Sequence, residues 1–302
     1  MERHRRKVRS YDIFAGHAHY TPAWGGLFAL LGLMLAGALL GSLVTVLLTK
    51  FYGPSFATDY GTLVSYPLMF VPPMMYAGFK SRSNAVFEQG YALDSNHFGK
   101  PGPWLCALMA AAAVLAAAFM TDFLSAQMPP MPEWLDEALT SMTQGNLWVN
   151  LLCVSVFAPL FEEWLCRGMV LRGLLNAKQY DGSPRIKPVW AIVVSALFFA
   201  VIHANPWQAI PAFILGCLFG YIYYKTGSLK LTMLMHCVNN TFAVILGQID
   251  SLKEMDNWLD VLPPARYWVI FAACALLLIL IIRAFGRIEI QSPAGNCDPV
   301  SE

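Results

Sequence analysis

The sequence predicts an all-α, polytopic membrane protein with about eight transmembrane helices. Of its 302 residues, 57% are hydrophobic and only 13% are charged, about half the charged share of an ordinary soluble domain. The apolar residues also gather in runs close to the roughly 20 residues with which a helix crosses a bilayer. The low charge content and the net charge of +1 exclude a disordered chain, a coiled coil and a nucleic-acid-binding protein.

Eight apolar segments support this count. They cover residues 24–48, 63–79, 103–121, 147–171, 189–204, 209–224, 229–248 and 266–283. The second segment contains Pro67, Pro72 and Pro73, so we expect a kinked or broken helix there, because proline lacks a backbone N–H and clashes with the preceding turn. The fifth and sixth segments are short and are separated only by residues 205–208, which predicts a tight helical hairpin.

The charges between the segments predict the orientation in the membrane, because Lys and Arg gather on the cytoplasmic side of membrane proteins. The N-terminal tail and the loops 172–188 and 225–230 are basic, whereas the loops 122–146 and 249–265 are acidic. This alternation fits eight spans with both termini in the cytoplasm. The first apolar run has no cleavage site, which predicts a retained span rather than a signal peptide.

The fourth segment carries three charged residues inside an otherwise apolar stretch: Glu162, Glu163 and Arg167. A charged side chain deep in a membrane helix costs about 2.5–3.5 kcal/mol, so each of them needs a partner. Glu163 and Arg167 are four residues apart and can pair on one helix face, whereas Glu162 points about 100° away. Glu162 is then the free carboxylate. The alternative is that all three lie at the water interface and only anchor the helix.

Two later segments carry histidines. His203 follows Phe199 by one turn near the end of the fifth segment, and His236 and Asn240 share one face of the seventh. We expect the neighbouring Asn239 to point elsewhere. Each of these residues alone is compatible with a simple hydrogen bond between helices.

Taken together, a carboxylate, two imidazoles and a carboxamide from three spans are the groups that hydrolysis requires. They can activate water, with or without a metal ion, and can stabilise the developing oxyanion. Helix rise places His203 about 10 Å deeper than Glu162 and His236. Convergence of the three therefore requires tilted helices or a fifth helix that begins in the cytoplasm.

Three motifs in this order resemble those of the type II CAAX prenyl endopeptidases and their bacterial relatives, the CPBP (Abi) intramembrane proteases. They are Glu162-Glu163-x-x-x-Arg167, Phe199-x-x-x-His203 and His236-x-x-x-Asn240, within roughly residues 155–245. The resemblance implies an eight-helix, multi-pass protease of the bacterial inner (cell) membrane, with an active site open toward the cytoplasmic side. It implies a peptide or membrane-associated protein substrate, lipidated in the CAAX branch of the family, and contact with membrane lipids.

The resemblance also assigns a role to each motif residue. Among the catalytic residues, Glu162 would be the carboxylate that activates water and His203 the histidine that binds it. His236 and Asn240 would donate hydrogen bonds to the oxyanion. The supporting positions are Glu163, Arg167 and Phe199. One zinc ion held by Glu162, His203 and His236 is compatible with this pattern, as is activation of water without a metal, so the sequence leaves the cofactor open.

The chain accordingly divides into four parts: a basic cytoplasmic tail (1–22), three N-terminal transmembrane helices (23–145), a CAAX protease-like catalytic core with helices four to eight (146–285) and a cytoplasmic tail (286–302). The alternative function is a non-catalytic membrane protein on the same fold, either a transporter, in which Glu and His can relay protons, or a membrane-peptide binding or immunity factor. No inverted repeat is evident in the sequence, which weakens the transporter hypothesis. The H-E-x-x-H motif of zinc proteases is also absent from it.

Overall fold

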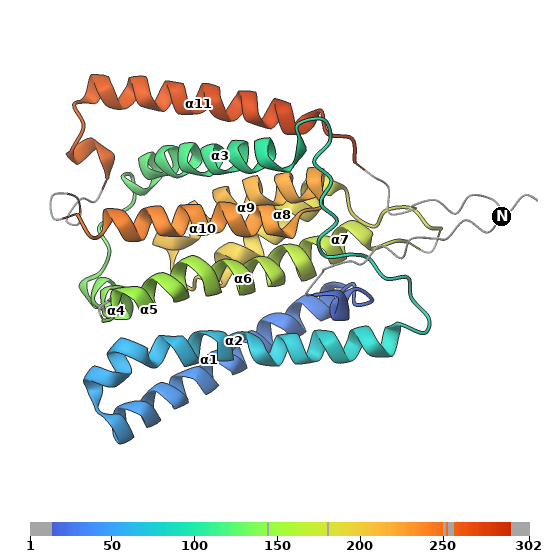
Figure 1. Ribbon diagram of the computed structural model, residues 1–302, viewed down its shortest axis with the longest axis horizontal. Coiled ribbons are helices and arrows are strands. Elements are labelled where there is room, and N and C mark those ends of the chain that lie inside the picture. The colour runs from blue at the N-terminus through green and yellow to red at the C-terminus, as the bar shows by residue number, and fades with distance from the viewer. Residues whose placement is uncertain (1–13, 144, 180, 250–251, 253–256, 291–302) are drawn as a thin grey trace, which may run out of the picture.

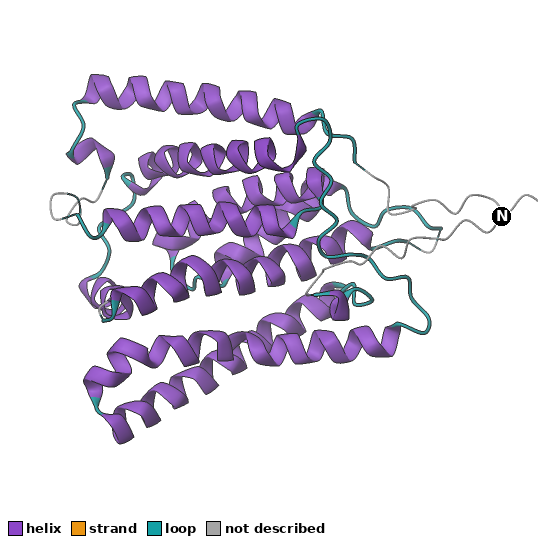
Figure 2. Ribbon diagram, viewed as in Figure 1, coloured by secondary structure: helices purple, strands orange, loops and turns teal. Residues whose placement is uncertain are grey.

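The structure is a computed structural model that describes residues 14–143, 145–179, 181–249, 252 and 257–290. In these residues the fold is a bundle of helices without strands (Figures 1 and 2). The long helices are α1 (Trp24–Tyr52), α2 (Pro54–Asn84), α3 (Gly102–Ser125), α8 (Pro188–Val201), α9 (Pro206–Thr226), α10 (Leu229–Leu246) and α11 (Pro264–Gly286). Three short helices are η1 (Ala15–His17), α4 (Glu133–Thr143) and η4 (Trp258–Asp260).

One further span is continuous but changes its helical geometry along its length. It consists of α5 (Leu147–Leu152), the π-helix η2 (Cys153–Phe157), α6 (Ala158–Glu163), the π-helix η3 (Trp164–Leu171) and α7 (Arg172–Asn176). With this span, each of the eight predicted apolar segments coincides with a helix. Within the described residues, 6 of these helices are long and apolar enough to cross a membrane. The all-α polytopic fold is therefore confirmed.

Of the kink or break that the sequence predicts for the second segment, the break is absent, because α2 continues as one helix across its three internal prolines. Pro73 cannot donate to the carbonyl of Met69, four residues earlier. That carbonyl lies against Gly37 of α1, and one turn further a side chain at Gly41 would come within 2.7 Å of the Ser65 carbonyl. Two glycines four residues apart thus allow α1 and α2 to pack closely. This contact supports α2 at the turn where Pro73 cannot make the backbone hydrogen bond of a regular helix.

The connections lie at two opposite ends of the bundle (Figure 1). The described residues 14–23 and the connections 85–101 and 177–187 lie at one end, which we call the basic end. Its Lys and Arg residues include Lys100, Lys178, Arg185, Lys187, Lys230 and Arg287. The acidic end holds the described residues of the connections 126–146 and 247–263, among them Glu133, Asp136, Glu137 and Asp260. The two sets of loops that the sequence separates by charge are thus separated in space.

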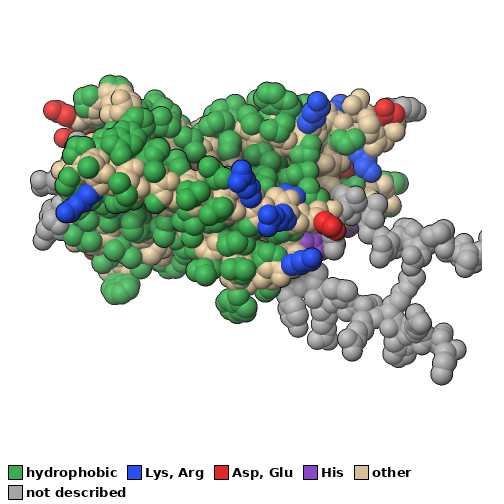
Figure 3. All heavy atoms as spheres, turned by 90° about the horizontal axis from the view of Figure 1, so that it is seen from above, with side chains coloured by type: hydrophobic (Ala, Val, Ile, Leu, Met, Phe, Trp, Pro, Cys, Tyr) green, Lys and Arg blue, Asp and Glu red, His purple; other side chains and the backbone are tan. Residues whose placement is uncertain are grey.

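The flanks of the bundle between these ends are apolar. Leu39, Trp104 and Val269 expose 73%, 87% and 70% of their surface, and Figure 3 shows hydrophobic side chains covering most of one flank. So large an apolar surface is unfavourable in water. It fits the hydrocarbon core of a bilayer, so the multi-pass membrane protein is consistent with both the helix lengths and the surface.

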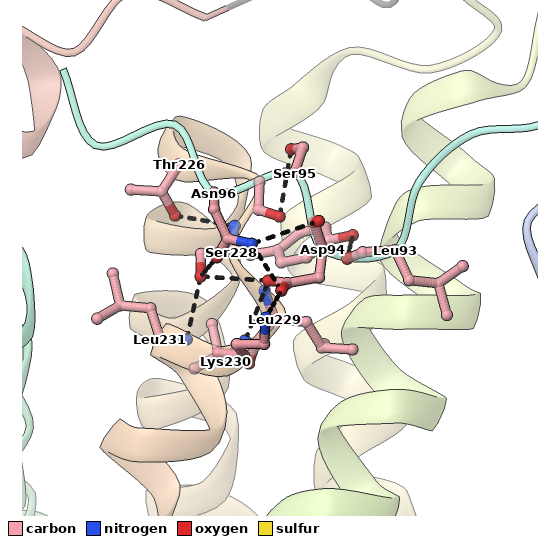
Figure 4. A network of polar contacts seen from close by, with 12 residues as sticks. Leu93, Asp94, Ser95, Asn96, Thr226, Ser228, Leu229, Lys230 and Leu231 are labelled. Atoms are coloured by element: carbon pink, nitrogen blue, oxygen red, sulfur yellow. Dashed lines mark hydrogen bonds and ion pairs between the residues drawn. The ribbon is translucent and has the colours of Figure 1, made fainter. Parts of the chain in front are cut away.

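A polar network at the basic end holds the start of α10 (Figure 4). The Asp94 carboxylate accepts hydrogen bonds from the backbone N–H of Leu229, at 2.9 Å, and from the Ser228 hydroxyl, at 3.3 Å. It also pairs with the Lys230 ammonium at 2.8 Å. An acceptor at a helix N-terminus satisfies N–H groups that lack partners and interacts favourably with the helix dipole. Asp94 therefore ties the connection 85–101 to the helix that carries His236.

Arg172 ties the chain before α1 to the same end. Its guanidinium is buried and donates hydrogen bonds to the carbonyls of Ala18, Tyr20 and Tyr91, at 3.0, 2.6 and 2.8 Å. Residues 14–22, which the sequence placed in a cytoplasmic tail, thus pack on the bundle. The remainder of that predicted tail and residues 291–302 lie outside the described residues.

We expect the acidic end to face the cell exterior, because the basic end carries most of the Lys and Arg residues. Glu133→Cys and Asp260→Cys, each in a cysteine-free variant, should react with a membrane-impermeant thiol reagent in intact cells. Lys178→Cys, at the basic end, is the matched control and should react only after permeabilisation. Protection of both acidic-end positions in intact cells would contradict the predicted orientation.

Candidate active site

A cavity of about 740 Å³ lies among the fourth span, α8, α9 and α10. Its wall contains the four predicted catalytic residues and one supporting residue: Glu162, His203, His236, Asn240 and Phe199. Segments that are far apart in sequence thus converge on one space, as the motif hypothesis requires. The other two supporting residues, Glu163 and Arg167, lie behind this wall and are buried.

Glu163 and Arg167 form the predicted ion pair. Their Oε1 and Nη1 atoms are 2.9 Å apart, and both side chains are 0% exposed, so the alternative in which they only anchor the helix at the water interface is wrong. Arg167 also donates through Nη2 to the Gly216 carbonyl of α9, at 3.0 Å. Its guanidinium lies 4.6 Å from the centre of the Phe199 ring, a favourable cation–π distance. The buried cation is therefore stabilised by three helices.

Glu163 has a second role that its spacing does not reveal. Its Oε1 lies 3.1 Å from Nδ1 of His236. A carboxylate paired with Arg167 accepts hydrogen bonds, so the hydrogen lies on Nδ1 of His236 and the ring orientation is set. The other ring nitrogen, Nε2, faces Glu162, whose Oε2 is 3.9 Å away. Glu163 thus positions a cavity residue in addition to neutralising Arg167.

The Glu162 carboxylate meets a residue that sequence analysis missed. Its Oε1 accepts a hydrogen bond from the hydroxyl of Tyr66 in α2. Its Oε2 has no hydrogen-bond partner among the described residues. A tyrosine hydroxyl in an apolar segment is a weak signal, and no spacing rule connects α2 with α6. One oxygen of Glu162 is therefore held, and the other remains available on the side of His236.

His203 lies just beyond the end of α8, in the turn that leads to α9. Its Nδ1 is 2.7 Å from the Phe199 carbonyl, so Nδ1 donates and Nε2 of the neutral ring is an acceptor. Asn205 holds the turn by donating to the His203 carbonyl, at 2.9 Å, and by accepting from the backbone N–H of Gln208, at 2.9 Å. The predicted hairpin is therefore present, and it fixes the histidine at the cavity.

Asn240 donates through Nδ2 to the carbonyl of Val154, at 2.8 Å. Val154 lies in the π-helix η2, and a backbone carbonyl has two lone pairs, so it can accept from a side chain as well as from its own helix. One of the two Nδ2 hydrogens of Asn240 is thus used, and the second remains for the cavity. The expectation that Asn239 points away from Asn240 is wrong. Its Nδ2 donates to Oδ1 of Asn240, at 3.1 Å, and the side chain lines the cavity. The cavity extends around α10 far enough to reach both neighbours.

The three residues named as zinc ligands share the cavity wall, but they do not gather into a ligand set. Among the described residues, no group of three or more His, Cys, Asp or Glu side chains is arranged to hold a metal ion. The closest approach given by the structure is the 3.9 Å between His236 and Glu162. The zinc ion stays a prediction of the sequence.

Comparison with known proteins supports the motif hypothesis for this part of the chain. Residues 144–242 match the family model of the Rce1-like type II CAAX prenyl endopeptidases. Over 104 residues the chain is 33% identical to the membrane-embedded CAAX protease MroQ of Staphylococcus aureus, and the alignment covers 33% of this chain and 41% of that protein. The chain therefore spans less than half the length of the relative it matches. No solved structure matches the chain.

We expect the two adjacent glutamates to respond differently to substitution. Glu163→Gln and Arg167→Ala each leave a buried charge without its partner, which typically costs about 3–5 kcal/mol, so both should lower the amount of folded protein. Glu162→Gln keeps an acceptor for Tyr66 and should leave that amount near normal. The measurement is the monomer peak of each variant in size-exclusion chromatography. Equal losses for all three would mean that Glu162 is also part of the buried pair.

Proposed function

We propose that the chain, whose residues 144–242 match the family model of the Rce1-like type II CAAX prenyl endopeptidases, is a CPBP-type intramembrane endopeptidase. The observation that carries the proposal is the single cavity wall shared by Glu162, His203, His236 and Asn240. A free carboxylate oxygen, an imidazole acceptor and two hydrogen-bond donors are what the hydrolysis of a peptide bond requires.

We assign the activation of water to Glu162 and His203. A water molecule between them can donate one hydrogen bond to Oε2 of Glu162 and one to Nε2 of His203. As its oxygen bonds to the peptide carbonyl carbon, Glu162 takes the proton. The Tyr66 hydroxyl holds the other oxygen of the same carboxylate and so keeps the base oriented.

We assign the stabilisation of the oxyanion to His236 and Asn240. The two residues are one turn apart on α10, so their donors can converge on one oxygen. Nδ2 of Asn240 supplies one hydrogen bond, and Nε2 of His236 supplies the other when it carries a hydrogen. Glu163 orients this ring, because its Oε1 lies 3.1 Å from Nδ1 of His236. The C–N bond then breaks, and Glu162 returns its proton to the leaving amine.

We propose a peptide or membrane-associated protein as the substrate, lipidated if the chain acts in the CAAX branch. His236 lies about 10 Å along α10 from Leu229, and Asn240 lies about 9 Å from Leu246 at the other end of the same helix, so the reaction would take place near the middle of the bilayer. With the basic end in the cytoplasm, the membrane would be a bacterial inner membrane and both termini would be cytoplasmic. Membrane lipids contact the apolar flanks.

The proposal is tested by comparing the membrane proteomes of cells that carry the native chain and the Glu162→Gln variant. Proteins whose new termini appear only with the native chain are candidate substrates, and purified native protein should cleave peptides that span those termini. Equal cleavage by the native and variant proteins would contradict the proposal. Capture of the same peptides without cleavage would favour the alternative of a non-catalytic binder on this fold.

Asn240→Ala should lower turnover about 10²–10³-fold, the usual effect of removing one oxyanion donor, while substrate binding stays nearly unchanged. Asn240→Asp should also be poor, because a carboxylate repels the developing oxyanion. Steady-state kinetics on the peptides identified above separate kcat from KM. Full turnover with a raised KM in Asn240→Ala would instead assign Asn240 to helix packing or ground-state binding.

Tyr66→Phe removes the hydrogen bond to Glu162 and leaves the ring in place. We expect kcat to fall and KM to change little, because Tyr66 orients the base and lies behind it. Tyr60→Phe is the matched control, since Tyr60 is an exposed tyrosine of the same helix, and it should alter neither constant. If both variants behave alike, Tyr66 has no role in positioning Glu162.

A further inference from the structure

The orientation of the Asn240 carboxamide decides whether this residue donates a hydrogen bond into the cavity. Its Nδ2 carries two hydrogens, whereas its Oδ1 only accepts. A half-turn about the last side-chain bond exchanges the two groups in space and would turn the donor into an acceptor. A residue that stabilises an oxyanion therefore has to be held in one of these two orientations.

The first contact that holds Asn240 is with the backbone of the fourth span. Its Nδ2 donates to the carbonyl of Val154, at 2.8 Å. Because a carbonyl has no hydrogen to donate, a reversed carboxamide would place two acceptor oxygens against each other at this point. Val154 therefore keeps the nitrogen of Asn240 on its own side.

The second contact is with the preceding residue of α10. Nδ2 of Asn239 donates to Oδ1 of Asn240, at 3.1 Å. In the reversed orientation of Asn240, two amide nitrogens would meet there, and an amide nitrogen does not accept. Val154 and Asn239 thus bind the two ends of one carboxamide. A reversal of Asn240 alone would break both hydrogen bonds.

The hydrogen bond from Asn239 also affects the strength of the donor. A carboxamide that accepts at its oxygen is polarised, so its N–H groups become better donors, and this effect is larger where water is partly excluded. Asn239 and Asn240 are half-buried, and both line the cavity. Asn239 is therefore placed to strengthen the hydrogen bond that Asn240 makes with its free Nδ2 hydrogen.

We propose that Asn239 is a positioning residue, which holds the Asn240 carboxamide in the orientation that donates to the reacting carbonyl. Asn239 occupies an unspecified position of the His236-x-x-x-Asn240 motif. Its role parallels that of Glu163, which contacts His236, so each of the two oxyanion donors is held by a second residue. The inference rests on the proposed function for the oxyanion, but the orientation of Asn240 does not depend on it.

Two replacements of Asn239 test this role in the full-length protein. Asn239→Leu keeps the size of the side chain and removes the donor, whereas Asn239→Asp places a second acceptor opposite Oδ1 of Asn240. Thr241→Val is the matched control on the same helix. Thr241 contacts Cys237, at 3.8 Å, and this described residue lies outside the cavity wall.

The first readout needs no substrate. In protein with isotope-labelled asparagine side chains, the Nδ2 signals of Asn240 are identified by their loss in Asn240→Ala, and their hydrogen exchange is followed by NMR. Exchange should be about 2–10-fold faster in both Asn239 variants, as the loss of one hydrogen bond predicts, and unchanged in Thr241→Val. Unchanged exchange in both Asn239 variants, or equally faster exchange in the control, overturns the proposal.

The second readout is steady-state kinetics on the peptides found for the native chain. Both Asn239 variants should lower kcat and leave KM nearly unchanged, and Asn239→Asp should approach the loss of about 10²–10³-fold expected for Asn240→Ala. Thr241→Val should alter neither constant. A raised KM with full kcat in the Asn239 variants overturns the positioning role.

A double-mutant cycle separates positioning from a general structural effect. When Asn239→Leu is added to Asn240→Ala, kcat should fall no further, because the side chain on which Asn239 acts is gone. A full additional loss in the double variant overturns the proposal. If the native protein cleaves no peptide while exchange at Asn240 responds as expected, the proposed function fails and the orienting role of Asn239 stands.

Discussion

The structure depends on the buried ion pair of Glu163 and Arg167, in which each charge requires the other. Neither Glu163 nor Arg167 reaches solvent, and a single charge left in that position would be strongly destabilising. The pair therefore recruits partners from every helix around it: the Gly216 carbonyl of α9, the Phe199 ring of α8 and the His236 ring of α10. Two of these partners, Phe199 and His236, also line the cavity, so the surroundings of the buried arginine form part of its wall.

Changes of helical geometry complete this arrangement. The span 147–176 contains two π-helices, and each presents a carbonyl to a side chain of another helix. Val154 accepts from Asn240, at 2.8 Å, and Cys166 accepts from Ser195, at 2.8 Å. The π-helices therefore connect the fourth span to α10 and α8 at the same levels at which the cavity forms.

The two ends of the bundle differ in construction as well as in charge. At the basic end, Asp94 and Arg172 use buried charges to hold connections against helix ends. At the acidic end, α5 and α9 begin and α10 ends beside the cavity.

Features that depend on residues close in sequence were predictable. The eight apolar segments, the charge of their connections and the pairing of Glu163 with Arg167 follow from helix length, local composition and the four-residue spacing, so the fold class and the content of the motifs could be recognised in advance. The roles of the motif residues, the zinc ion and the orientation stay predictions. α2 continues unbroken across its prolines, where it packs on Gly37 and Gly41 of α1, a contact that no pattern within α2 reveals.

The remaining features required helices that are distant in sequence to be placed side by side. The hydrogen bond from Tyr66 to Glu162, the contact of Glu163 with His236 and the position of Asn239 on the wall depend on how α2, α6 and α10 pack. Helical periodicity states which residues share a face, but it does not state which helix lies opposite that face. The sequence accordingly predicted four residues of one site and the Glu163–Arg167 pair, and the packing of the helices determined which further residues they contact.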